Sequence, residues 1–207
     1  MAEAQRAIEA GASALGLVSA MPSGPGPIDE DTIAAIAATA PPEVDTFLLT
    51  ALQDAAAIID QQRRCGTRVL QLVDEVAAAE LAKLRAALPA VKLVQVIHVT
   101  GIEALAQAQT VAPLVDALLL DSGNPSLAIK QLGGTGRTHD WAVSRRIRDA
   151  VAVPVWLAGG LGAHNVGAAI AAVRPHGVDL CNGVRSEGRL DAVKLRAFFA
   201  ALPPAAA

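Results

Sequence analysis

Short apolar runs recur along the chain, each bounded by polar residues or glycine. Most start about 24 residues apart. Within each run, apolar residues mostly follow one another and do not alternate with polar ones. Such continuous runs are typical of parallel strands that are buried on both faces. The pattern therefore predicts seven strands. They begin at Ser13, Asp45, Arg68, Lys92, Asp116, Val153 and Gly177.

Helical segments lie between these runs, and several carry recognisable end signals. The segment "DEDTIAAIAATA" offers Asp29 as its N-cap and ends at Pro41-Pro42. The segment "LQDAAAIIDQQRRCG" ends in two arginines and Gly66, which is a C-terminal signature. A further helix, "EAQRAIEA", precedes the first predicted strand, so the pattern predicts eight helices in all.

Strict alternation of strands and helices predicts a parallel sheet, either closed as a TIM barrel or open as a doubly wound sheet. The expected order is one helix followed by seven strand–helix units, and one more strand before residue 1 would complete a (β/α)₈ barrel. For residues 1–207 we therefore expect one α/β domain, which as a barrel would be a TIM (β/α)₈-type barrel missing the first strand. Its first and last strands would then present open edges.

Composition and charge narrow the range of functions. Hydrophobic residues make up 53% of the chain and charged residues 18%, with a formal net charge of −3 and no basic block. This favours a globular protein and argues against nucleic-acid binding. No apolar run is long enough for a membrane span, and the N-terminus lacks the features of a signal peptide. With only Cys65 and Cys181, and no histidines at metal-ligand spacing, we expect a cytoplasmic protein without a metal.

Two glycine-rich stretches near the end of the chain are candidates for phosphate binding. In "WLAGGLGAHNV" a strand runs into Gly159-Gly160 shortly before a helix, and "CNGVRSEG" places Gly183 after the last strand. Glycines there allow a phosphate to approach backbone N–H groups, and in TIM barrels the loops after strands 7 and 8 often form one phosphate site. A Rossmann fingerprint is not met, and a plain tight turn is the alternative interpretation of the glycine pair.

A third candidate is Asp121, at the end of the run "ALLLD". Burial at a barrel mouth could raise its pKa and suit it to general-acid work, or it could cap its own loop through Ser122 or Gly123. The long loop that follows contains "QLGGTGRTHDW", with Gly133 and Gly134. This stretch is not a Walker A motif, and a long glycine-rich loop after a strand is typical of a mobile cover over an active site.

Together these motifs resemble the phosphoribosylanthranilate isomerase family of tryptophan biosynthesis. "DALLLDS" with "GGTGRTHDW", and "LAGGLGAHNVGAAIAAVRPHGVDLCNGV", are similar to the family's L-L-D-[ST], G-G-T-G-x-x-F-D-W and L-A-G-G-L blocks, and "VLQLVDE" is similar to its V-Q-L-H-G-x-E. The resemblance implies an Amadori rearrangement without cofactor or metal, with Asp121 as the general acid, in a monomer or homodimer. It also implies substrate and phosphate contacts at Gly133, Gly134, Gly159, Gly160, Gly183 and Gln71.

Several positions depart from the family pattern. The family's base is a cysteine in a K-[IV]-C-G motif, which this sequence does not contain. The family's S-P-R, whose arginine binds the anthranilate carboxylate, aligns with "SGPGP", and Val73, His139 and Arg185 replace a histidine, a phenylalanine and a glutamate. The phosphate half of the site is therefore kept and the anthranilate half is altered. An isomerase is the first hypothesis, and a catalytically impaired or repurposed relative that binds or converts another phosphosugar is the second.

Overall fold

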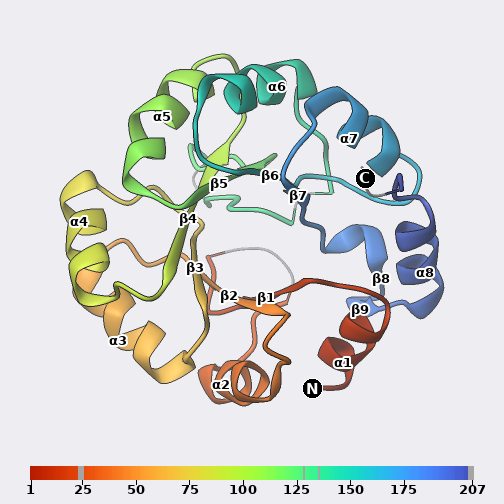
Figure 1. Ribbon diagram of the computed structural model, residues 1–207, viewed down its shortest axis with the longest axis horizontal. Helices are drawn as coiled ribbons and strands as arrows, with labels where there is room; N and C mark the ends of the chain where they lie inside the picture. Colours follow the sequence, from red (N-terminus) through yellow and green to blue (C-terminus); the bar gives the residue numbers. More distant parts are fainter. Residues whose placement is uncertain (23–25, 128, 135, 205–207) are drawn as a thin grey trace.

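Seven parallel strands form the centre of the protein and curl into a partial barrel with the helices on the outside (Figure 1). The structure is a computed structural model that describes residues 1–22, 26–127, 129–134 and 136–204. The strands pair in sequence order, from the first to the seventh. They are β1 (Ala14–Val18), β2 (Asp45–Thr50), β3 (Val69–Leu72), β4 (Lys92–His98), β5 (Ala117–Asp121), β6 (Val155–Leu157) and β7 (Gly177–Val178).

Within the described ranges, eight α-helices surround this sheet and follow the predicted alternation. They are α1 (Ala2–Glu9), α2 (Glu30–Thr39), α3 (Ala55–Cys65), α4 (Ala78–Ala87), α5 (Ala104–Val111), α6 (Trp141–Ala150), α7 (Val166–Val173) and α8 (Ala192–Ala200). The predicted end signals are confirmed, because the Asp29 side chain accepts a hydrogen bond from the Thr32 N–H and Gly66 ends α3 at φ 65°. The TIM-barrel-type architecture is therefore confirmed. Among the described residues, no helix has the length and apolar content that crossing a membrane requires.

Alternation along the strands divides the buried side chains into two layers. Leu48, Leu70 and Leu118 belong to the layer between sheet and helices, and none of them is exposed to solvent. The residues that alternate with them point into the curl of the sheet, where they form a smaller apolar cluster. That inner cluster contains Phe47, Val69, Val94, Val96, Ala117 and Leu119. A side chain on the inner face at the carboxyl end of a strand therefore lies at the mouth of the barrel.

A short antiparallel hairpin follows the sheet and was not predicted. It pairs β8 (Arg185–Ser186) with β9 (Arg189–Leu190), directly after the 3₁₀ helix η2 (Asn182–Val184). Both turn residues, Glu187 and Gly188, have positive φ, which is the conformation that a two-residue type I′ turn requires. Glu3 of α1 holds the hairpin, because its carboxylate accepts hydrogen bonds from Arg185 and from the Leu190 N–H. A second 3₁₀ helix, η1 (Ala112–Leu114), extends α5.

Candidate active site

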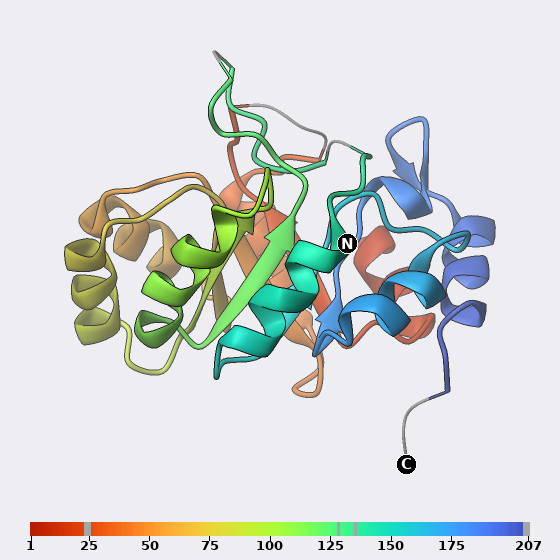
Figure 2. The same cartoon turned by 90° about the horizontal axis from the view of Figure 1, so that it is seen from above.

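A cavity of about 230 Å³ opens at the carboxyl ends of β5, β6 and β7. Loops gather on this side of the sheet, with the long loop after β5 rising above it (Figure 2). Five of the residues predicted from the sequence line the cavity together. They are Asp121, Gly134, Gly159, Gly160 and Gly183.

Asp121 is the last residue of β5 and lies on the same face of that strand as Ala117 and Leu119, inside the curl. Its side chain is buried, and Oδ1 accepts a hydrogen bond of 2.7 Å from the Ser122 N–H. Burial raises the pKa of Asp121, although the Ser122 N–H and the nearby His98 oppose the shift. Both interpretations of this residue thus have support, since the carboxyl caps its own loop and also faces the cavity.

A second carboxyl, Asp179, faces the same cavity and was not predicted as a site residue. It follows β7 directly, and its backbone N–H donates to the Leu157 carbonyl at 2.9 Å. Burial and the charge of Asp121 raise the pKa of Asp179 from 3.8 to about 6. Two neighbouring carboxyls in a poorly solvated site disfavour a double negative charge, so the pair tends to keep one proton. In the sequence, the alternation of side-chain faces along "GVDLC" was the signal that could have identified Asp179 as a site residue.

Glycine is required at two turns because of close backbone contacts. Gly160 has φ 61°, and a Cβ added there would lie 2.6 Å from the carbonyl carbon of Arg137. A Cβ added at Gly183 would lie 2.0 Å from the Leu161 carbonyl oxygen. The loop after β5, the turn after β6 and η2 are therefore in direct contact. Without side chains at these points, a phosphate can approach the backbone N–H groups of the turns.

The loop after β5 also contacts the candidate acid. Gly133 has φ 138°, and a Cβ added there would lie 2.7 Å from Oδ2 of Asp121. The Gly134 carbonyl accepts a hydrogen bond of 2.7 Å from the Asn182 side chain, which ties the loop to η2. Gly134 thus lines the cavity, whereas Gly133 does not line it and instead packs against Asp121.

Gln71 lies elsewhere. It is buried in β3, and it lines neither this cavity nor the second one described below. In the sheet register Val94 pairs with both Gln71 and Ala117, so Gln71 is level with the start of β5, four residues before Asp121. The structure does not bring it to the phosphate cavity.

Three other side chains that drew attention in the sequence have distinct surroundings. His139 is a partly buried residue whose Nε2 lies 2.7 Å from Ser144 Oγ, and burial lowers its pKa to about 4. Cys181 lines the cavity, where burial raises the pKa of its thiol, whereas Cys65 is buried at the end of α3. The aligned "SGPGP" segment includes residues 23–25, which lie outside the described residues.

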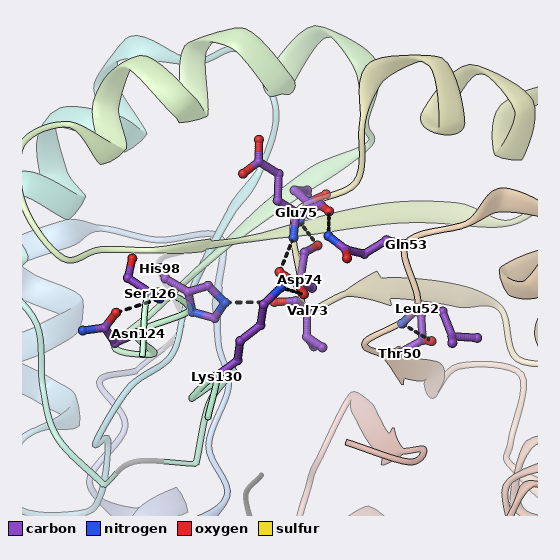
Figure 3. Close-up of polar contacts among 11 residues, drawn as sticks. Thr50, Leu52, Gln53, Val73, Asp74, Glu75, His98, Asn124, Ser126 and Lys130 are labelled. Atoms are coloured by element: carbon purple, nitrogen blue, oxygen red, sulfur yellow. Dashed lines mark hydrogen bonds and ion pairs between the residues drawn. The ribbon is translucent and has the colours of Figure 1, made fainter. Parts of the chain in front are cut away.

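A second cavity, of about 470 Å³, opens beside the first at the carboxyl ends of β3 and β4. Its lining includes Gln53, Asp74, His98, Ser126 and Lys130. Lys130 reaches from the loop after β5 to Asp74, with Nζ 2.5 Å from Oδ2 (Figure 3). His98 Nε2 lies 2.9 Å from the Val73 carbonyl, so this ring nitrogen carries the proton.

Comparison with known proteins gives consistent results. The family model described as N-(5'phosphoribosyl)anthranilate (PRA) isomerase matches residues 2–201. The chain is similar to the N-(5'-phosphoribosyl)anthranilate isomerase of Haloferax volcanii, with 41% identity over 194 residues, 93% of this chain and 84% of that protein. It is also similar to the N-(5'-phosphoribosyl)anthranilate isomerase 2 of Methanosarcina mazei, with 35% identity over 195 residues, 93% of this chain and 85% of that protein.

Solved structures show the same likeness. The phosphoribosyl anthranilate isomerase of Thermotoga maritima superposes with a TM-score of 0.82 at 25% identity, covering 97% of this chain and 92% of that one. A phosphoribosyl anthranilate isomerase in complex with reduced 1-(o-carboxyphenylamino)-1-deoxyribulose 5-phosphate superposes with a TM-score of 0.78 at 24% identity, covering 96% and 91%. The second structure supports the fold alone.

Proposed function

The chain belongs to the N-(5'-phosphoribosyl)anthranilate isomerase family, and we propose that Asp121 is its general acid, in the cavity over β5 to β7. The protein is an aldose–ketose isomerase of tryptophan biosynthesis. It converts N-(5-phosphoribosyl)anthranilate into 1-(2-carboxyphenylamino)-1-deoxyribulose 5-phosphate. The observation that carries the assignment of the acid is a buried carboxyl at the end of β5, in one cavity with the glycine turns.

The first chemical step is opening of the ribose ring. A proton from the Asp121 carboxyl goes to the ring oxygen, the C1–O bond breaks, and the nitrogen lone pair forms an iminium with C1. An acid must hold a proton near neutral pH to do this. The burial that raises the pKa of Asp121 favours that protonated form.

The second step removes the proton from C2, and the resulting enamine then becomes the ketone. The resemblance gives this step to a cysteine in a motif that the present sequence does not contain. Among the described groups that line the cavity, Asp179 combines an acidic side chain with a pKa of about 6, so it is largely ionised at pH 7. We propose that Asp179, which shares the cavity with Asp121, takes part in this step as a proton acceptor. Because C1 is reduced as C2 is oxidised within one molecule, no external redox partner is needed.

The glycine turns supply the phosphate site in this proposal. The contacts of Gly160 with the loop after β5 and of Gly183 with Leu161 bring three backbone segments together around the cavity. Gly133 and Gly134 cover the bound sugar phosphate, which excludes water while the iminium exists. Both cysteines are free thiols, which fits the proposed cytoplasmic location, and we propose a monomer or homodimer.

Complementation tests the function directly. A tryptophan auxotroph that lacks phosphoribosylanthranilate isomerase should grow without tryptophan when it expresses this chain, and should not grow with the Asp121→Asn variant at equal protein level. Expression without growth would contradict the isomerase assignment. Binding of the sugar phosphate without turnover would favour the repurposed relative instead.

A further inference from the structure

The second cavity supports an inference about substrate binding that goes beyond the family assignment. It lies over β3 and β4, whereas the phosphate cavity lies over β5 to β7. Their linings approach each other at adjacent strand ends, because His98 of the second cavity pairs in register with Asp121 of the first. A ligand that extends from Asp121 away from the glycine turns and across the barrel mouth is therefore directed toward the second cavity.

The substrate has the shape to do this. It carries a phosphate at one end and an aromatic carboxylate at the other, with the reacting ribose carbons between them. Once the phosphate is on the glycine turns and the ribose is beside Asp121, the aromatic ring extends away from the phosphate. Its carboxylate then needs a cation or several hydrogen-bond donors, because a carboxylate placed in a cavity without partners is strongly disfavoured.

Lys130 is the only lysine or arginine among the described residues that line either cavity. Its ammonium carries three N–H donors, so it can bind a substrate carboxylate while it keeps the ion pair with Asp74. Asp74 suits the role of an anchor, because its side chain is only 8% exposed and its other oxygen accepts the Glu75 N–H at 2.9 Å. The Lys130 side chain is 42% exposed and remains accessible to a ligand.

The backbone that carries Lys130 is also held in place. Asn124 and Gln131 form an antiparallel bridge, with N–H···O distances of 2.7 and 3.1 Å, which closes the loop segment around Lys130. At its base Gly123 packs on His98, since a Cβ there would lie 2.3 Å from Nδ1. The position of Lys130 is thus set by the Asn124–Gln131 bridge, by the contact of Gly123 with His98 of β4, and by the ion pair with Asp74, which Figure 3 shows.

We propose that Lys130 binds the anthranilate carboxylate of the substrate and thereby determines the specificity for the aromatic amine. The inference rests on the proposed function. It assigns carboxylate recognition to the loop after β5, whereas the family's arginine position aligns with "SGPGP" in this sequence. Lys130 binds one end of the substrate and takes no part in the proton transfers.

The test compares two substrates with two variants. N-(5-phosphoribosyl)anthranilate carries the carboxylate, and N-(5-phosphoribosyl)aniline differs only in lacking it. For Lys130→Met we expect KM for the anthranilate substrate to rise about tenfold, because a hydrogen-bonded ion pair is lost, with kcat little changed. KM for the aniline substrate should stay within about twofold of the parent value. Lys130→Arg should restore most of the anthranilate affinity, since it retains the charge.

Lys83→Met is the matched control, because Lys83 is ion-paired with Glu80 on α4 and lines neither cavity. It should leave both KM values unchanged. An equal rise in both KM values for Lys130→Met would show that Lys130 only supports the loop, and would overturn the proposal, as would no change at all. If the unmodified chain converts neither substrate, the proposed function fails and the role of Lys130 fails with it.

Discussion

Replacing Gly160 by alanine tests whether the loop after β5 must rest on the turn after β6. A Cβ at Gly160 would lie 2.6 Å from the Arg137 carbonyl carbon, 2.7 Å from its oxygen and 2.8 Å from the Thr138 nitrogen. These are backbone atoms, which cannot rotate aside as the end of a side chain can. The loop would have to retreat by roughly 1 Å to restore an ordinary carbon–carbon separation of about 3.5 Å.

Two costs follow from this substitution, and they can be separated. Alanine at φ 61° loses roughly 1–2 kcal/mol of folding free energy through backbone strain alone. A displacement of about 1 Å near the reacting groups lowers kcat/KM by about a hundredfold. Gly66→Ala is the matched control, because Gly66 has φ 65° at the end of α3 and open space around its Cβ position.

Denaturant unfolding and steady-state kinetics should be measured on both variants. We expect a similar or larger loss of unfolding free energy for Gly160→Ala than for Gly66→Ala. Only Gly160→Ala should lose kcat/KM, while Gly66→Ala stays within about twofold of the parent. If Gly160→Ala retains full kcat/KM, the loop contact at Gly160 is not needed for catalysis and the reasoning is wrong.

Three further predictions follow from the buried titratable groups. Asp121→Asn should lower kcat by about 10²–10⁴-fold, whereas the exposed control Asp31→Asn should not; a kcat within tenfold of the parent would argue against an acid at this position. The raised pKa of Asp179, about 6, gives a stabilisation that is complete below about pH 4 and lost as pH rises through 6. The unfolding free energy of Asp179→Asn should therefore fall less over that range, by roughly 2 kcal/mol, and parallel curves would refute this. His139 has its pKa lowered from 6.5 to about 4, so its own contribution to stability is lost on acidification between those values; the stability of His139→Phe relative to the parent should therefore rise as pH falls over this range, and a constant difference would contradict it.

The order of elements could be predicted because its signals are local. Continuous apolar runs, the Asp29 cap and the Gly66 end signal each act within a few residues, and all correspond to observed elements. The β8–β9 hairpin was missed because its strands, Arg185–Ser186 and Arg189–Leu190, are mostly polar and form no apolar run. Glu187-Gly188 was its one local turn signal.

The site could be predicted only in part. Asp121 and the glycine turns were found because they end predicted strands within recognisable motifs. Gln71 also lies in a recognisable motif, but how far it lies from the carboxyl ends of the strands depends on the register of β3 against β4 and β5. That register cannot be predicted from the residues of a single strand. The ion pair of Lys130 joins residues 56 positions apart, so only the folded chain brings its partners together.

The most direct test of the account is a crystal structure of this protein with reduced 1-(o-carboxyphenylamino)-1-deoxyribulose 5-phosphate. We predict the phosphate against the backbone of Gly160 and Gly183, the ribulose chain beside Asp121 and Asp179, and the carboxylate on Lys130. A phosphate bound away from the glycine turns, or a sugar chain out of hydrogen-bond reach of Asp121, would contradict the central claim.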